Sequence, residues 1–139
     1  MLKFVKKINI SAADFYNTIL LSLIQDVKQA TGKTISVADL EYGYKCQSRV
    51  KRRGRTVESR INIGRPVLNK EIVTTITVQQ STYQMKYTIE ELSENSIRVT
   101  HIQTGSVSDN FLNRILFKSK TNRRFKEIEK KLKQAKKGN

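Results

Sequence analysis

Few residues in this chain are of the types that perform acid–base or nucleophilic chemistry. His101 is the only histidine and Cys46 is the only cysteine. A zinc site needs three or four ligands, and a general base needs a reacting group within hydrogen-bond reach. One histidine and one cysteine on separate predicted strands therefore indicate ordinary strand residues. Cys46 follows Lys45, whose charge favours a thiolate, but no neighbouring base accompanies the pair.

The adjacent carboxylates Glu90 and Glu91 do not form an acid–base pair either. Neighbouring residues of a strand point to opposite faces of the sheet, so the two cannot act on one substrate. The sequence therefore predicts no catalytic residue, no metal site and no cofactor. It favours a binding protein over an enzyme, without deciding between them.

Positive charge is the strongest compositional signal. The formal net charge is +15, and two segments carry all of the excess: residues 45–70 sum to +8 and residues 114–137 sum to +9. This distribution fits an anionic partner, which would be a nucleic acid, an acidic membrane surface or a phosphorylated ligand. The alternative is that these charges are solvated faces that keep the protein soluble.

The first basic segment contains a predicted hairpin tip around Gly54. Its four cations are Lys51, Arg52, Arg53 and Arg55. A protruding basic loop can enter a nucleic-acid groove or lie along phosphates. The Arg-Gly-Arg core is similar to that of a minor-groove AT-hook, but Thr56 stands in place of the proline. A solvated tip explains the same residues and is the favoured interpretation.

The second basic segment falls on a predicted helix. At ~100° per residue, four lysines share one face of this helix: Lys126, Lys130, Lys133 and Lys137. An apolar stripe lies beside them at Phe125, Ile128 and Leu132. A basic amphipathic helix suits phosphates or an anionic membrane surface. A half-buried helix with a solvated side is the alternative.

Hydrophobic periodicity predicts the elements that position these residues. Residues 2–10 alternate in polarity and predict a strand. A helix is expected over residues 12–31, because Ser11 and Asp14 resemble a capping box and Gly32 supplies a C-terminal cap. Its apolar residues, from Phe15 to Val27, recur at helical spacing.

A short helical turn is predicted at residues 36–40, and five segments rich in β-branched and aromatic residues follow it: 42–50, 56–63, 71–78, 83–91 and 96–103. Their short links require antiparallel hairpins. Residues 108–137 predict one long helix, although the polar stretch 118–124 leaves two shorter helices as an alternative; no Gly or Pro interrupts it. The predicted order is β-α-β-β-β-β-β-α.

The chain has the length of one domain, and we expect a single α+β domain over residues 1–139. The longest mostly apolar stretch, residues 19–24, is far short of the ~20 residues of a transmembrane helix. Residues 2–10 also lack the pattern of a secretory signal. With one cysteine and these features, we expect a cytoplasmic protein.

The element order and the segment Ile8-Asn9-Ile10-Ser11-Ala12-Ala13-Asp14-Phe15 resemble the start of the START-like superfamily, which includes polyketide cyclase and Bet v 1-type proteins. More narrowly, Ser11 to Gly32, Glu94 to Thr100 and the basic C-terminal helix are similar to a bacterial family known only as a domain of unknown function. The resemblance covers nearly the whole chain, but it is one of pattern and includes no diagnostic motif.

The resemblance implies a helix-grip fold, in which an antiparallel sheet of about six strands wraps around the long C-terminal helix. Such folds often enclose a cavity, so the implied function is non-catalytic binding of a small amphipathic or lipid-like ligand. Helix register in that fold gives the expected lining: Tyr42, Tyr44, Tyr83, Tyr87, Lys118, Ser119 and Asn122. The alternative function is nucleic-acid binding through the basic hairpin and the C-terminal helix. The oligomeric state is not indicated.

Overall fold

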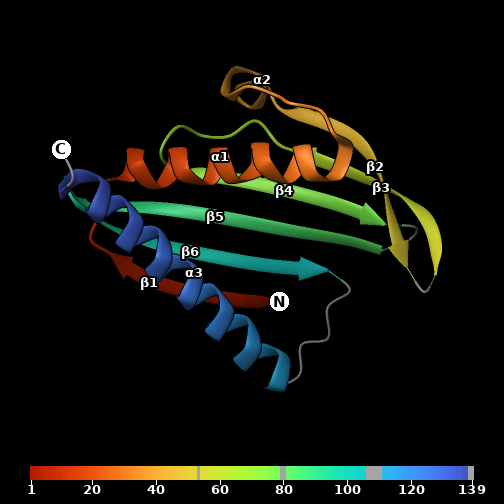
Figure 1. Cartoon of the computed structure of the whole chain (residues 1–139). Coiled ribbons are helices and arrows are strands. Elements are labelled where there is room, and N and C mark those ends of the chain that lie inside the picture. The colour runs from red at the N-terminus through yellow and green to blue at the C-terminus, as the bar shows by residue number, and fades with distance from the viewer. Residues whose placement is uncertain (53, 79–80, 106–110, 138–139) are drawn as a thin grey trace.

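A computed structural model of the chain describes the backbone of residues 1–52, 54–78, 81–105 and 111–137, and the side chains of residues 1–49, 54–78, 81–105 and 120–134. One antiparallel sheet carries two long helices on one of its faces (Figure 1). In chain order the elements are β1 (Leu2–Ile8), α1 (Ala12–Thr31), α2 (Val37–Glu41), β2 (Tyr44–Arg52), β3 (Arg55–Ile63), β4 (Glu71–Val78), β5 (Ser81–Ser93), β6 (Ser96–Gly105) and α3 (Phe111–Lys137). The predicted order of strands and long helices is confirmed.

The boundaries of α1 are those predicted from its caps. The Ser11 hydroxyl accepts a hydrogen bond from the Asp14 N–H at 3.1 Å, and Gly32 closes the helix at φ +76°. A side-chain oxygen at the N-cap satisfies a backbone donor that the helix leaves free, and glycine adopts the left-handed conformation without strain. Local sequence therefore determines both ends of this helix.

Several strand boundaries differ from the prediction by one or two residues, and an open alternative for the last helix is settled. β2 begins at Tyr44 and not at residue 42, because Tyr42 ends α2 and Gly43 turns the chain at φ +84°. α3 is one continuous helix across residues 118–124, so the two-helix alternative is wrong. The polar stretch interrupts the apolar pattern without interrupting the backbone.

The six strands follow the order β1-β6-β5-β4-β3-β2, in which β1 and β2 are the edges. All pairs are antiparallel, as the short links require. Register places Tyr87 of β5 between Ile72 of β4 and His101 of β6, and His101 is opposite Phe4 of β1. Because strand side chains alternate between faces, these four side chains form one row across the face that the helices cover.

The core lies between this row and the two helices. Phe15 of α1 and Phe125 of α3 are both fully buried and meet edge to face at a centroid distance of 5.6 Å. Aliphatic side chains of the sheet surround them: Ile8, Ile63, Ile72, Ile89, Ile97 and Val99. Burial of this apolar area is the main stabilising term of the fold.

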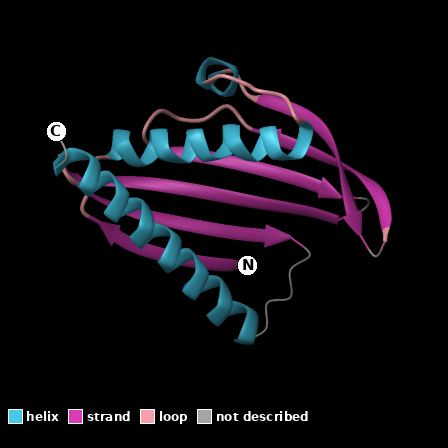
Figure 2. Ribbon diagram, in the orientation of Figure 1, coloured by secondary structure: helices cyan, strands magenta, loops and turns pink. Residues whose placement is uncertain are grey.

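Both long helices lie on the same side of the sheet, and α3 crosses it diagonally (Figure 2). The helices come together along the C-terminal half of α3, where Arg124 Nη2 donates a hydrogen bond to Ser22 Oγ of α1 at 2.9 Å. They diverge toward the end of the sheet at which β4 and β6 end. The arrangement is the predicted helix-grip fold.

Candidate ligand and anion sites

One end of the space between sheet and helices is filled by aromatic side chains. Tyr87 lies between Phe15 and Phe125, at centroid distances of 6.4 and 6.3 Å, and Phe4 contacts Phe125 at 5.7 Å. The tyrosine ring stacks on His101 at 4.3 Å and 27°. Tyr87 is therefore a core residue here, which corrects its predicted place in a cavity lining.

His101 is the buried polar member of this aromatic cluster, with only 6% of its surface exposed. Its pKa is lowered from 6.5 to about 4, first by burial and then by the nearby charge of Arg124, against a smaller opposing effect of a backbone hydrogen bond at Lys86. The imidazole is therefore neutral at physiological pH. This environment agrees with the interpretation of His101 as a structural strand residue.

Arg124 connects α3 to this cluster from the solvent side. Its Nη1 donates to the Tyr87 hydroxyl at 3.0 Å while Nη2 reaches Ser22 of α1. These contacts fasten α3 to both the sheet and α1. Arg124 belongs to the basic segment 114–137, and nothing local in the sequence indicates that it would contact a tyrosine 37 positions away.

The opposite end of the same sheet face is covered less evenly. Ser48, Ser59 and Thr74 of this face are buried, but several of its other side chains are only partly buried. They form what we term the open patch: Cys46, Ile61, Ile76, Tyr83 and Met85. Register makes four of them consecutive across the strands, since Cys46 is opposite Ile61, Ile61 is opposite Ile76, and Ile76 is opposite Tyr83. The patch coincides with the end at which α1 and α3 diverge in Figure 1.

A recess of about 700 Å³ adjoins the open patch at β2 and β3. Its lining includes Tyr44, Cys46 and Ile61 on the helix-facing side, but also Lys45 and Arg60 from the other side of the sheet. Because residues of both faces contribute, the recess is not an enclosed chamber between sheet and helices. It widens access to the patch from the β2 edge.

The other residues predicted to line a cavity lie in different places. Tyr44 and Tyr83 lie on the helix-facing side and are partly exposed. Tyr42 is 84% exposed beyond the end of β2, so its predicted place in the lining is wrong, because α2 extends one residue further than expected. The side chains of Lys118 and Ser119 lie outside the described residues. Asn122 faces the β1 edge, where its Oδ1 accepts a hydrogen bond from Lys6 Nζ at 2.7 Å.

A second recess, of about 540 Å³, lies between the edge strand β1 and α3. We term it the β1–α3 groove; it is lined by Lys6, Lys7, Asn9, Lys126, Glu129, Lys130, Lys133 and Gln134. Three of the four lysines predicted as a helix stripe are therefore in one recess. The side chain of the fourth, Lys137, is outside the described residues. The fold adds Lys6 and Lys7 from a strand more than a hundred residues away.

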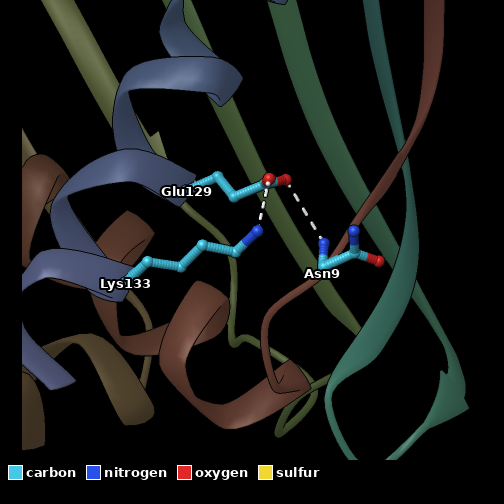
Figure 3. A network of polar contacts seen from close by, with 3 residues as sticks. All are labelled: Asn9, Glu129 and Lys133. Atoms are coloured by element: carbon cyan, nitrogen blue, oxygen red, sulfur yellow. Dashed lines mark hydrogen bonds and ion pairs between the residues drawn. The ribbon is translucent and has the colours of Figure 1, made fainter. Parts of the chain in front are cut away.

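Glu129 is the single carboxylate of the groove and is held from both sides (Figure 3). Its Oε1 accepts from Lys133 Nζ at 3.1 Å, and its Oε2 accepts from the Asn9 N–H at 3.3 Å. Burial opposes ionisation, but these hydrogen bonds and the charges of Lys133 and Lys6 lower the pKa of Glu129 overall. Glu129 therefore stays ionised and fastens α3 to the end of β1.

Lys6 is a partly buried cation of this groove. Burial lowers its pKa, and the charge of Lys126 lowers it further, against a smaller opposing effect of Glu129. Sequence reasoning missed this residue, although a signal was available. Leu2, Phe4, Lys6 and Ile8 alternate onto the helix-facing side of β1, so one cation occupies a position where the pattern predicts an apolar residue.

The predicted hairpin contact is described only in part. Arg55 opens β3 and is exposed. The side chains of Lys51, Arg52 and Arg53 lie outside the described residues. No group of three or more His, Cys, Asp or Glu side chains that could hold a metal is found among the described residues. Within them, no helix is long and apolar enough to cross a membrane.

The fold is that of START-like proteins. It resembles Mll3558 from Rhizobium loti, with a TM-score of 0.54 and 15% identity over 91% of this chain and 92% of that one. A START superfamily protein from Mycobacterium smegmatis gives a TM-score of 0.51 and 14% identity, over 96% and 97% of the two chains. The protein Ara h 8.0201 gives 0.51 and 15%, over 95% and 97%. At these identities the likeness concerns the fold alone.

The chain belongs to the family described as Domain of unknown function (DUF3284), whose model matches residues 2–121. The predicted resemblance to a START-like family of unknown function is thereby confirmed. No curated protein sequence matches the chain significantly.

Proposed function

We propose that this protein is a non-catalytic START-like binding module that holds a small amphipathic or lipid-like ligand between its sheet and its two long helices. The observation that carries the proposal is the open patch. Its side chains belong to the face that is buried elsewhere in the fold, yet they stay partly exposed where α1 and α3 diverge. Small-molecule sites are concave, mainly apolar and bounded by a few polar groups.

The patch offers a ligand apolar surface next to isolated polar groups. Ile61, Ile76 and Met85 supply the aliphatic area, and each Å² that a ligand covers contributes ~25 cal/mol. Gln103 is directly opposite Met85 and partly buried, and Tyr83 carries a hydroxyl. Lys118 and Ser119 of α3 stay candidates for contacting a polar end of the ligand.

The proposal is tested by binding of the anionic apolar probe 8-anilinonaphthalene-1-sulfonate, followed by fluorescence. Ile76→Gln changes the open patch, whereas Thr88→Gln changes a residue of β5 that points to the opposite face and does not line the adjoining recess. We expect Ile76→Gln to weaken the wild-type affinity by about tenfold, since it removes apolar contact worth ~1.4 kcal/mol, and Thr88→Gln to leave it within about twofold. Equal effects of both variants, or no binding by the wild type, would rule out this site.

Native mass spectrometry of protein purified under non-denaturing conditions identifies the natural ligand class. We expect an added mass from an apolar or amphipathic compound, lost in Ile76→Gln and kept in Thr88→Gln. A wild-type spectrum with the bare chain alone, together with absent probe binding, would contradict the proposal.

A further inference from the structure

The β1–α3 groove has an excess of positive charge that its own acidic residue does not neutralise. Five lysines line it against one carboxylate. Glu129 is already engaged by Lys133 and by the backbone of Asn9. Lys7, Lys126 and Lys130 make no ion pair within the part of the chain that the structure describes. Like charges collected in one recess oppose folding unless an anion is bound there.

The groove is also preformed. The Asn122 amide oxygen holds the Lys6 ammonium at 2.7 Å, and burial, followed by the charge of Lys126, lowers the pKa of Lys6. Glu129 fixes Lys133 in the same way. At ~1.5 Å rise per residue, Lys126, Lys130 and Lys133 extend over roughly 10 Å of α3. Such spacing suits an anion with several charged oxygens rather than one monovalent ion.

The lining chemistry distinguishes between occupants. Among the described residues, the lining contains no aromatic side chain. Proteins that bind single-stranded nucleic acids use such side chains to stack the bases. The same lining contains no apolar side chain for insertion into a bilayer, because the apolar face of α3 is turned to the core at Phe125. A concave volume of about 540 Å³ is within the range of small-ligand sites.

We propose that the β1–α3 groove binds a small compound carrying a multiply charged phosphate group, with Lys6, Lys126 and Lys130 contacting the phosphate oxygens. Lysine ammonium groups contact phosphate as point charges and so accept more than one orientation. The side chains of Asn9 and Gln134 also line the groove and can contact polar groups on the rest of the compound. This site is separate from the open patch and does not depend on the proposed function.

The test is calorimetric titration of the full chain with inorganic tripolyphosphate at pH 7.5 and 150 mM salt. Lys126→Gln combined with Lys130→Gln removes two groove charges at exposed positions. The matched control is Lys28→Gln with Lys70→Gln, which removes two charges at exposed positions outside the groove. We expect the groove variant to bind at least tenfold more weakly and the control to stay within about threefold, because screened charges at a distance act weakly.

Amide chemical-shift mapping of the wild-type chain locates the site without any variant. We expect tripolyphosphate to shift residues 6–9 and 126–134. Absence of binding, equal losses in both double variants, or shifts elsewhere in the chain would each overturn the proposal. A groove-dependent interaction with a DNA duplex or with phosphatidylserine vesicles, in the absence of tripolyphosphate binding, would overturn it in favour of that macromolecular partner.

Discussion

Acidification is expected to destabilise this protein chiefly through His101. The folded-state pKa of His101 is lowered from 6.5 to about 4, because the ring is buried against Tyr87 and lies near the charge of Arg124. The folded protein therefore binds this proton less readily than the unfolded chain does. Stability that is fully present above pH 6.5 is lost as the pH falls toward 4, and the loss levels off below that value.

The size of the effect follows from the shift. Each pKa unit corresponds to 1.36 kcal/mol, so between pH 7.5 and 4.5 His101 should reduce the free energy of unfolding by about 2–3 kcal/mol. Since the side chain is only 6% exposed, solvent screening does not reduce this figure greatly. A loss of this size is a large part of the ~5–15 kcal/mol that stabilises a typical domain.

Urea unfolding followed by circular dichroism at a series of pH values measures the effect. The informative quantity is the difference between the wild type and His101→Asn, because other titrating groups contribute to both. Burial raises the pKa of Asp26, so this residue opposes the loss of stability on acidification. The pKa of Glu129 is lowered, so this residue adds to the loss of stability at lower pH. We expect the variant to be less stable at pH 7.5 but to lose about 2–3 kcal/mol less on acidification.

Two outcomes would refute this reasoning. One is an unchanged pH dependence in His101→Asn. The other is a titration of the His101 ring by NMR with a midpoint above pH 6 in the folded protein.

Two further predictions concern packing and backbone. Phe125→Ala should lower the free energy of unfolding by about 3–5 kcal/mol, because the ring is fully buried at the junction of both helices with the sheet. Arg123 is exposed, so Arg123→Ala should lower it by under ~0.5 kcal/mol. Urea unfolding midpoints that differ little between the two variants would contradict this prediction. Gly105→Ala should lower the free energy of unfolding by about 2–5 kcal/mol, since the φ of Gly105 is +131° and a Cβ atom would press on the backbone of β5. Gly32→Ala should lower it by about 1–2 kcal/mol, because Gly32 has a φ of +76° but lies in open space. Thermal unfolding that ranks the two variants in the reverse order would show that the close approach at Gly105 is absent.

The local elements of this fold follow from the sequence. Ser11 and Gly32 bound α1 as predicted, since a cap acts through hydrogen bonds within a few residues. The strand pattern and the short links were sufficient for the antiparallel order. The boundary between α2 and β2 was predicted less well. The helix α2 extends to Glu41, so Tyr42 is not part of β2.

The candidate sites depend on contacts between residues far apart in sequence. The lysine stripe of α3 was predictable from helical periodicity. Its position beside Lys6 in one groove was not, because the Lys6–Asn122 hydrogen bond joins residues 116 positions apart. Likewise, the sequence could not show that Tyr87 would be enclosed by Phe15 and Phe125 while Tyr83, four residues earlier on the same face, stays partly exposed. Periodicity assigns a side chain to a face of its own element. Only the crossing of α1 and α3 over the sheet decides which part of that face is core and which part is accessible to a ligand.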